Sequence, residues 1–188
     1  MQVITRQLPR HELGAYATHL LALDADDRRL RFGQAINDAA IRGYVERIDA
    51  GRDTIFGVID ADLELVGAAH LARGAHYAEL GISVLAGHRR RGVGAALLQR
   101  AQLHARNWGI PEFFTHCLRE NAPLMRLARR YGMQVIVEGG EADGFIALPP
   151  PDASTHAVEL LADRVGRFDH LLKSQAFALR QVAAAWLA

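Results

Sequence analysis

One stretch of the sequence limits the possible folds of this chain more than any other. It joins an apolar run, Leu80–Leu85, to a run with helical spacing, Val93–Asn107. Between them lies the segment Arg89–Ala95, which reads RRRGVGA. The first amides of a helix lack intrahelical acceptors and carry the positive end of its dipole. Gly92 and Gly94 have no Cβ, so the backbone can curve and an anion can approach it closely. The segment therefore predicts a strand, a phosphate-binding loop and a helix in succession.

The other interpretation of this segment is an ordinary strand-to-helix turn with a solvated basic edge. Two well-known types of phosphate-binding loop do not match its sequence. A P-loop needs Lys and then Ser or Thr after its last glycine, but the only lysine in the chain is Lys173. A dinucleotide fingerprint needs a third glycine where Leu97 stands. The arginines Arg89, Arg90 and Arg91 would add forked donors at the rim. The remaining pattern is R-x-x-G-x-G.

Three motifs together resemble the GNAT family of N-acetyltransferases, and most closely the bacterial lysine acetyltransferase type. The R-x-x-G-x-G loop has the form of the family's pyrophosphate-binding loop. Ala78–Val84 resembles the strand whose backbone pairs with the pantetheine arm, and Asn121–Met133 resembles the second cofactor motif. The resemblance covers residues 1–148 and implies one α/β domain with a mixed, mostly antiparallel sheet flanked by helices. Residues 149–188 lie outside it, as a proline linker and a C-terminal helical extension.

Hydrophobic periodicity predicts the individual elements. Strands are expected at Val3–Leu8, Thr54–Ile59, Leu63–Leu71, His76–Leu85, Glu112–Leu118, Gln134–Glu138 and Phe145–Leu148. Helices are expected at His11–Leu23, Asn37–Ile48, Val93–Asn107 and Pro123–Tyr131. The segment Asp24–Gly33 is polar and alternates in charge, which favours a loop.

The composition argues against several classes of protein. Of the 188 residues, 50% are hydrophobic and 23% charged, and the formal net charge is +1, which disfavours disorder and nucleic-acid binding. No apolar stretch approaches the ~20 residues of a membrane span, and the N-terminus lacks a signal-peptide core. We therefore expect a cytoplasmic protein with no membrane partner. Cys117 is the only cysteine and the nine histidines form no metal-binding pair, so we expect no structural metal.

The resemblance implies acetyl-CoA as cosubstrate. Its expected ligands belong to the central strand, the loop and the second motif: Ile82, Val84, Arg89, Arg90, Arg91, Gly92, Val93, Gly94, Ala95 and Asn121. The amide of Ile82 is expected to stabilise the oxyanion, and that of Val84 to bond the pantetheine. Asn121 either bonds the pantetheine or only caps its helix.

Glu79 is the candidate general base. An alkylamine with a pKa of ~10.4 is mostly protonated at neutral pH, and removing the proton costs about 4 to 5 kcal/mol. A positioned base is therefore useful. A glutamate stands at the corresponding place in bacterial protein lysine acetyltransferases, and apolar neighbours on the strand are expected to raise the pKa of Glu79. The alternative is a surface glutamate paired with an arginine.

The chain departs from the family at the position of the general acid. Many members carry a tyrosine where this chain has Ala128. Tyr131 is expected to be a core aromatic, which leaves His116, Tyr77 or a water to protonate the thiolate. The resemblance thus implies direct acetyl transfer from acetyl-CoA to a primary amine of a protein lysine or a small molecule. The alternative is a non-catalytic acyl-CoA-binding regulatory module.

Two further segments have two interpretations each. Arg28–Phe32 follows an acidic run and weakly resembles a loop that flanks the acceptor channel in lysine acetyltransferases, but we favour a solvated loop. An apolar seam runs from Val158 to Trp186, and one helix over Thr155–Ala188 would be ~50 Å long. Gly166 could divide it into two pieces that fold back on the domain, or the seam could pair with a second chain. We expect a homodimer.

Overall fold

The computed structural model describes residues 3–187, which contain one seven-stranded sheet. Its strand order is β1-β2-β3-β4-β5-β7-β6. All neighbours are antiparallel except β4 and β5, which run parallel. The strands are β1 (Arg6–Gln7), β2 (Thr54–Ile59), β3 (Leu65–Arg73), β4 (Tyr77–Val84), β5 (Glu112–Leu118), β6 (Gln134–Glu138) and β7 (Glu141–Ala147). This is the mixed, mostly antiparallel sheet that the sequence predicts.

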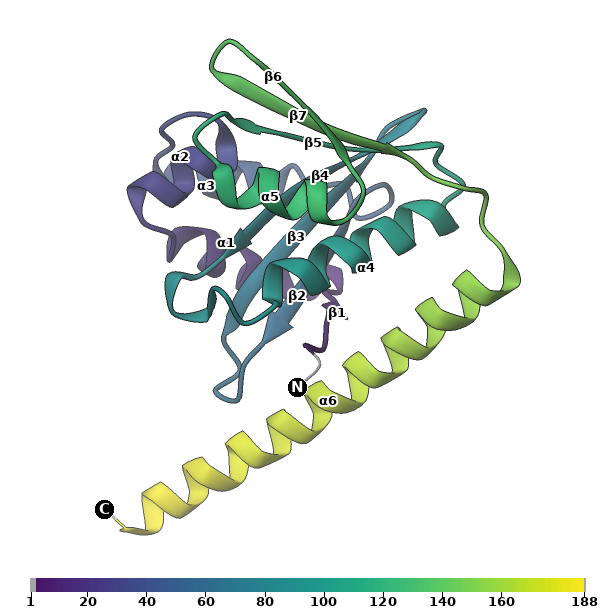
Figure 1. Ribbon diagram of the computed structural model, residues 1–188. Coiled ribbons are helices and arrows are strands. Elements are labelled where there is room, and N and C mark those ends of the chain that lie inside the picture. The colour runs from purple at the N-terminus through teal and green to yellow at the C-terminus, as the bar shows by residue number, and fades with distance from the viewer. Residues whose placement is uncertain (1–2, 188) are drawn as a thin grey trace.

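Helices cover both faces of the sheet. They are α1 (Leu13–Leu21), α2 (Ala25–Phe32), α3 (Asp38–Glu46), α4 (Val93–Asn107), α5 (Ala122–Arg130) and α6 (Ala153–Leu187), with short 3-10 turns η1 (Arg10–Glu12) and η2 (Ala86–His88). In Figure 1, α1 to α3 lie behind the sheet, while α4 and α5 lie in front of it.

Each face of the sheet has its own apolar core, because successive strand residues point to opposite faces. The larger core lies under α4 and α5 and includes Phe56, Leu97 and Phe113, all fully buried. The smaller core joins the sheet to α1 and α3 around Leu20 and Ile41. Strands β2 and β3 contribute residues to both cores, so this part of the sheet is packed from both sides.

The segment between α1 and α3 is a helix, so the prediction of a loop at Asp24–Gly33 is wrong. The Asp24 carboxylate caps α2 by accepting from the Asp27 amide at 2.8 Å. Gly33 ends the helix with φ of 75°, a left-handed conformation suited to glycine. Acidic residues occupy the first turn and arginines the last, which complements the helix dipole. These terminal signals outweigh the polar composition.

Two strands differ most from their expected bounds, while the ends of β3 and β4 shift by only one or two residues. β1 pairs with β2 through only two residues, whereas the sequence predicts a strand over Val3–Leu8. β7 starts at Glu141, not at Phe145, because it pairs with β5 along its whole length and with β6 from Glu141 to Phe145. The ends of these strands are set by their partners and not by local pattern. Tyr131 packs partly buried against the larger core, as expected.

The C-terminal extension is one continuous helix, α6, in which Gly166 makes no break. Gly166 instead lies where α6 crosses β1, and a Cβ there would come within 2.6 Å of the Thr5 carbonyl oxygen. Figure 1 shows α6 running along the domain and extending past its edge. Among residues 3–187, no helix combines the length and apolar character needed to cross a membrane.

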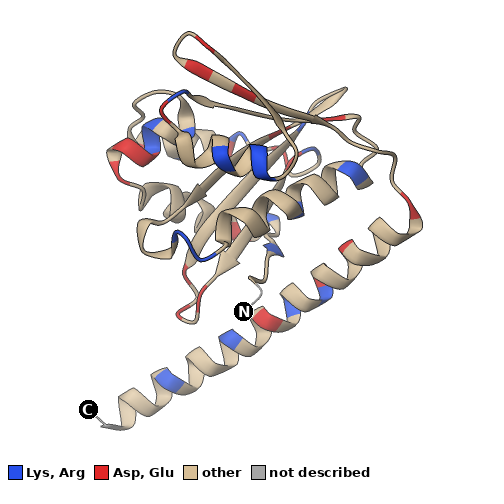
Figure 2. Ribbon diagram, in the orientation of Figure 1, with Lys and Arg blue, Asp and Glu red and all other residues tan. Residues whose placement is uncertain are grey.

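The face of α6 that contacts the domain is polar. Glu159 and Asp163 form ion pairs with Arg100 of α4, and Lys173 donates to the Ile59 carbonyl oxygen at 2.8 Å. The apolar seam is instead exposed. Along the ribbon of α6, charged residues alternate with longer uncharged stretches (Figure 2). The exposed members of the seam are Val158, Leu161, Val165, Phe168, Leu172, Leu179, Val182 and Trp186. Leu160 and Leu171 of the same helix are exposed as well.

Candidate active site

The sheet forks between β4 and β5. The two strands pair only from Tyr77 to Glu79, and the Thr115 hydroxyl then donates to the Leu80 carbonyl oxygen at 2.8 Å. The N–H and C=O of one strand residue point to the same edge, and this edge alternates along the strand. Because the Leu80 carbonyl points toward β5, the amides of Ile82 and Val84 face the open fork. The fork thus exposes strand donors that have no ladder partner on β5.

The other side of the fork is closed by the N-terminus of α4. Gly92 is the N-cap residue with φ of 83°, and no side chain caps the helix. The amides of the first turn therefore remain available to a ligand. A Cβ on Gly94 would lie 3.5 Å from Leu127 and 3.9 Å from Val84, between α5 and β4. Side chains larger than glycine at this position would enter the space between those elements.

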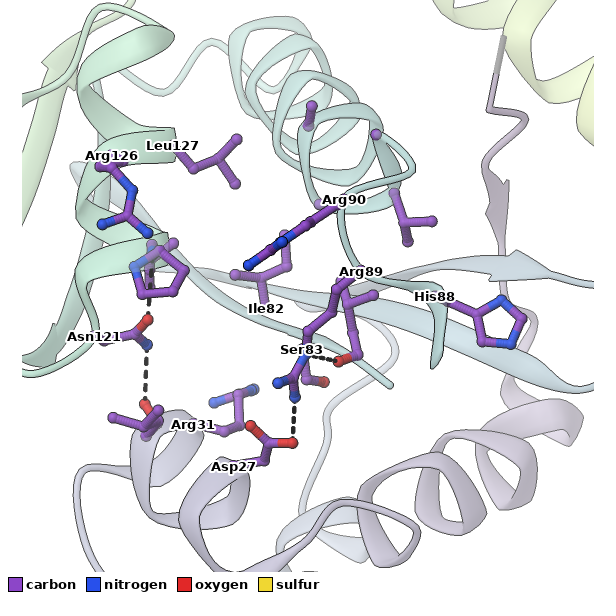
Figure 3. Close-up of a pocket in the computed structure, with 18 of the residues that line it drawn as sticks. Asp27, Arg31, Ile82, Ser83, His88, Arg89, Arg90, Asn121, Arg126 and Leu127 are labelled. Carbon is purple, nitrogen blue, oxygen red and sulfur yellow. Dashed lines mark hydrogen bonds and ion pairs between the residues drawn. The ribbon is translucent and has the colours of Figure 1, made fainter. Parts of the chain in front are cut away.

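A pocket of about 600 Å³ occupies this space. Its walls are α2, the second half of β4, the loop before α4, the first turn of α4 and the outer face of α5. In Figure 3, Arg89 and Arg90 enter from the loop, Asn121 and Arg126 from α5, and Asp27 and Arg31 from α2. The fork, the helix terminus and the basic side chains therefore meet in a single cavity.

The pocket carries an excess of positive charge. Its lining includes the arginines Arg31, Arg89, Arg90, Arg126 and Arg130. Asp27 is its only carboxylate among the described residues, and it is ion-paired with Arg89. Arg89 also donates from Nε to the Val84 carbonyl oxygen at 3.1 Å. Guanidinium groups around free helix amides suit a ligand with several phosphate charges.

The structure brings together all the predicted cofactor ligands except one. Ile82, Val84 and the loop and helix residues from Arg89 to Ala95 line the pocket, but Arg91 does not. Asn121 also lines it, where its side-chain oxygen accepts from the Leu124 amide at 3.2 Å. Its side-chain nitrogen donates to the Leu30 carbonyl oxygen at 3.5 Å, which links α5 to α2. The helix cap is thus present, and the bond to pantetheine stays a prediction.

Glu79 lies outside the pocket lining. It is exposed on β4, two residues before Gly81, and by strand alternation shares the face of the sheet covered by α1 to α3. His19 of α1 anchors the same strand, since its ring nitrogens contact the Leu65 carbonyl oxygen at 2.7 Å and the Ser83 hydroxyl at 2.9 Å. Burial lowers the pKa of His19 to about 4, so this imidazole is neutral. The base role of Glu79 stays a prediction.

The two side chains considered as general acids are also outside the lining. His116 is exposed on β5 and contacts Asp143 at 2.7 Å. That hydrogen bond, with the charges of Asp143, Glu141 and Glu79, raises the pKa of His116 above its usual value against a weaker effect of burial. Tyr77 is exposed and its ring packs edge-on against Phe114. Within residues 3–187, no three potential metal ligands cluster.

Four charged side chains of the pocket were not predicted to be ligands. Asp27 and Arg31 lie four residues apart on α2, and Arg126 and Arg130 lie four residues apart on α5. That spacing places each pair on one face of its helix. For α5 the spacing was a usable signal. For α2 it was hidden by the prediction of a loop, and the weak resemblance of Arg28–Phe32 to a channel-flanking loop was the better guide.

Known proteins identify the family to which this sequence and fold are similar. Residues 16–133 match the acetyltransferase (GNAT) family. A search of curated proteins found no significant match. Among solved structures, the GNAT domain of S. lividans PAT is similar with a TM-score of 0.66 and 18% identity, covering 77% of this chain and 89% of that one.

Two other similar structures are enzymes with different acceptors in their names. Ribosomal-protein-alanine N-acetyltransferase from Brucella melitensis has a TM-score of 0.62 and 16% identity, covering 78% of this chain and 100% of its own. Spermidine N-acetyltransferase from Vibrio cholerae, in complex with CoA and spermine, has a TM-score of 0.60 and 19% identity, covering 78% and 95%. The family match runs from α1 through α5, over more than half of the sequence. The chain therefore belongs to the acetyltransferase (GNAT) family.

Proposed function

We propose that this protein is a cytoplasmic N-acetyltransferase that moves the acetyl group of acetyl-CoA to a primary amine on a protein lysine or a small molecule. The forked sheet beside the uncapped start of α4 is the observation that carries the proposal, because it sets strand donors and helix donors in one basic pocket. The similar spermidine N-acetyltransferase, which holds CoA and spermine, supports the same class of cosubstrate and acceptor.

The cofactor would lie along the fork from α4 to the middle of β4. Its diphosphate would accept from the first-turn amides of α4, with Arg89 and Arg90 beside it. The pantetheine would continue the sheet by bonding the Val84 amide, as an added strand does. This places the thioester carbonyl at the Ile82 amide, which the sheet holds in position before the reaction begins.

The proposed reaction is a direct transfer. The amine nitrogen attacks the thioester carbon, and the carbonyl electron pair moves to the oxygen beside the Ile82 amide. The C–N bond forms, the C–S bond breaks, and the sulfur leaves as a thiolate, for which a pKa of ~8.5 makes a separate acid unnecessary. Glu79 would accept the proton of the amine. Its position three residues before Ile82, with an exposed carboxylate, supports this role.

A non-catalytic acyl-CoA-binding module is the second candidate function. It is favoured by Ala128, which is buried and offers no hydroxyl where many relatives carry a tyrosine. Thiol release from acetyl-CoA, measured across amines and lysine peptides, separates the two candidates once calorimetry has established CoA binding. Turnover on any amine supports the enzyme. CoA binding without turnover on the whole panel supports the module, and a failure to bind CoA contradicts both.

We also propose that α6 pairs two copies of this chain. The face of α6 that contacts its own domain is already filled by ion pairs, so the exposed apolar seam has no intramolecular surface to cover. Contiguous exposed apolar side chains of this extent mark interaction sites. A second copy offers the same seam in a self-complementary arrangement, as a two-fold dimer requires.

Charged substitutions in the seam test the pairing without removing the helix. Leu161 and Phe168 are each 62% exposed, so Leu161→Glu with Phe168→Glu should leave the domain folded. We expect sedimentation at micromolar concentration to show a dimer for the natural chain and a monomer for the double variant. His156→Glu, exposed near the start of the same helix, is the control and should stay dimeric. A natural chain that sediments as a monomer at all concentrations contradicts the dimer.

A further inference from the structure

Arg31 places a positive charge in the pocket, and no carboxylate of the described residues pairs with it. Its guanidinium rests directly on β4, where Gly81 leaves room for it, since a Cβ at Gly81 would overlap the guanidinium atoms. Across residues 3–187, no carboxylate oxygen lies within 4.0 Å of its nitrogens. Asp27, one helical turn away, is engaged by Arg89 instead.

The groups that hold Arg31 are neutral. Its Nη2 donates to the Tyr44 hydroxyl at 2.9 Å and to the Tyr16 hydroxyl at 3.2 Å. The guanidinium also lies 5.0 Å from the centre of the Phe32 ring. Nη1 bonds no described residue and is not buried, while Nε is buried without an acceptor. Burying a cation is costly unless it is paired, so this arrangement leaves a donor and a charge to be satisfied.

A buried chain of hydrogen bonds fixes the guanidinium from behind. The Tyr44 hydroxyl and Nδ1 of His70 share a hydrogen bond, and Nε2 of His70 lies 3.3 Å from the Asp53 carboxylate. Burial and the charge of Arg31 lower the pKa of His70 against the opposing effect of Asp53, so the ring is neutral and can accept from Tyr44. Burial likewise raises the pKa of Tyr16, which keeps its hydroxyl protonated. Arg31 is thus held rigidly, as a recognition group should be.

Arg31 lies at the reacting end of the pocket, apart from the phosphate end. It covers Gly81, the neighbour of Ile82, whereas Arg89 bonds the carbonyl of Val84. Three residues of strand, about 10 Å, separate Gly81 from Val84. The phosphates of a cofactor bound at α4 therefore leave Arg31 without a partner.

We propose that Arg31 binds a carboxylate of the substrate beside the reacting carbonyl carbon. This inference rests on the proposed function and specifies its substrate class. The carboxylate has two possible sources, which the guanidinium would bind by the same forked hydrogen bonds. It belongs either to an amino-acid acceptor or to the far end of a dicarboxylic acyl chain carried on CoA.

Paired ligands that differ only in the carboxylate test both sources on the natural protein. In the acyl arm, calorimetry compares succinyl-CoA with butyryl-CoA, which has the same chain length and no charge. In the acceptor arm, acetylation rates compare glycine, alanine and lysine with methylamine, ethylamine and cadaverine, their decarboxylated counterparts. We expect at least a tenfold preference for the carboxylate in one arm, and the arm that shows it identifies the source.

Variants then assign the preference to Arg31. Arg31→Met should reduce it at least tenfold while the affinity for unacylated CoA stays within threefold of the natural value. Arg42→Met, exposed on α3 and outside the pocket lining, is the matched control and should keep the preference. If Arg31→Met does not fold, Tyr44→Phe removes one bond that orients the guanidinium and should reduce the preference at least threefold.

Two results would overturn the inference. One is the absence of a carboxylate preference in both arms while CoA binds and neutral amines are acetylated, which leaves the proposed function standing. The other is an undiminished preference in folded Arg31→Met. A protein that binds no CoA would reject the proposed function, and the inference with it.

Discussion

A buried arginine and a half-buried one, in different regions of the molecule, are stabilised in different ways. Arg100, in the contact between α4 and α6, is 5% exposed and pairs with Glu159 and Asp163. Arg31, on the α2 wall of the pocket, has two tyrosine hydroxyls and no carboxylate within 4.0 Å among the described residues. Both stack on an aromatic ring, so the carboxylates are the difference between them. The charge of Arg100 is paired with carboxylates of the protein's own chain, whereas the charge of Arg31 is left for a ligand.

The difference separates stability from function. Removing one of the two carboxylates leaves the buried charge of Arg100 with a single partner in the folded protein, so the α4–α6 contact should govern folding. The pocket contains groups that remain unsatisfied in the folded protein, so changes there should alter binding and chemistry at little cost in stability. The effects expected of the variants would not be found if the α4–α6 contact also controlled binding or if the pocket also controlled stability.

Glu79→Gln is expected to have the largest effect. The acetylation rate at neutral pH should fall roughly 10²-fold, the usual scale for a general base, with an unchanged melting temperature. The loss should shrink as the pH rises, because the amine then loses its proton unaided. Glu112→Gln, exposed at the start of β5, serves as the control. Turnover close to that of the natural protein would make Glu79 a structural residue.

Gly94→Val should act on binding alone. The branched side chain would enter the pocket between β4 and α5, so the affinity for CoA should fall at least tenfold, or about 1.4 kcal/mol. Gly87→Val, at a position with no atom within 4 Å of its Cβ, should bind CoA normally. Calorimetry on the two folded variants makes the comparison, and equal affinities would remove the loop from the binding site.

Glu159→Gln should act on stability and in a pH-dependent way. Burial alone would raise the pKa of Glu159. The hydrogen bonds from His104 and Asn107, with the charges of His104 and Arg100, have the larger combined effect and hold this pKa below its usual value. Its contribution is therefore present above the unfolded pKa of ~4.3 and is lost as the pH falls through the lower folded value. At neutral pH the variant should lose about 1 kcal/mol.

Melting curves recorded from pH 7 to pH 3 measure this contribution. The gap between the natural protein and Glu159→Gln should be largest at neutral pH and should close in acid. CoA affinity at neutral pH should not change. A gap that stays constant with pH would mean that the Glu159 charge does not hold α6 to α4.

Gly166→Ala should have the smallest effect, and its sign is informative. Alanine gains up to ~1 kcal/mol of helix propensity, but its Cβ would press on β1, and overpacking costs ~1 to 3 kcal/mol. We expect a small net destabilisation in denaturant unfolding. Gly14→Ala in α1, where no atom lies within 4 Å of the Cβ, should be stabilising instead. Stabilisation by both would mean that α6 does not pack closely on β1.

The sequence predicted the elements whose signals are local. α4 has its expected bounds because apolar periodicity and the glycines at its two ends, Gly92 and Gly109, lie within one short segment. The residues from Arg89 to Ala95 also belong to one short segment, and all of them except Arg91 line the pocket as predicted. Motifs that are contiguous in sequence place their ligands together without tertiary information.

The missed features depend on contacts between distant segments. The position of Arg31 depends on Gly81 and on tyrosines of two other helices. These residues are far apart in the sequence, so no local pattern connects them. The apolar seam of α6 was identified, but the docked face is fixed by Arg100, which lies 63 residues before Asp163. The ion pairs of Glu159 and Asp163 with Arg100 hold the polar face of α6 inward, against the usual rule that the apolar face of a helix packs on the domain.

The short pairing between β4 and β5 has a consequence for hydrogen exchange. Only three residue pairs join the two strands, so the amide protons of Ile82 and Val84 are not protected by a neighbouring strand. In the empty protein they should exchange with deuterium faster than the amides of β4 that bond β3. A ligand that hydrogen-bonds to β4 in the fork, as an added strand would, should selectively slow the exchange of these two amide protons. Exchange measured residue by residue would thus map the position of the pantetheine arm without any mutation.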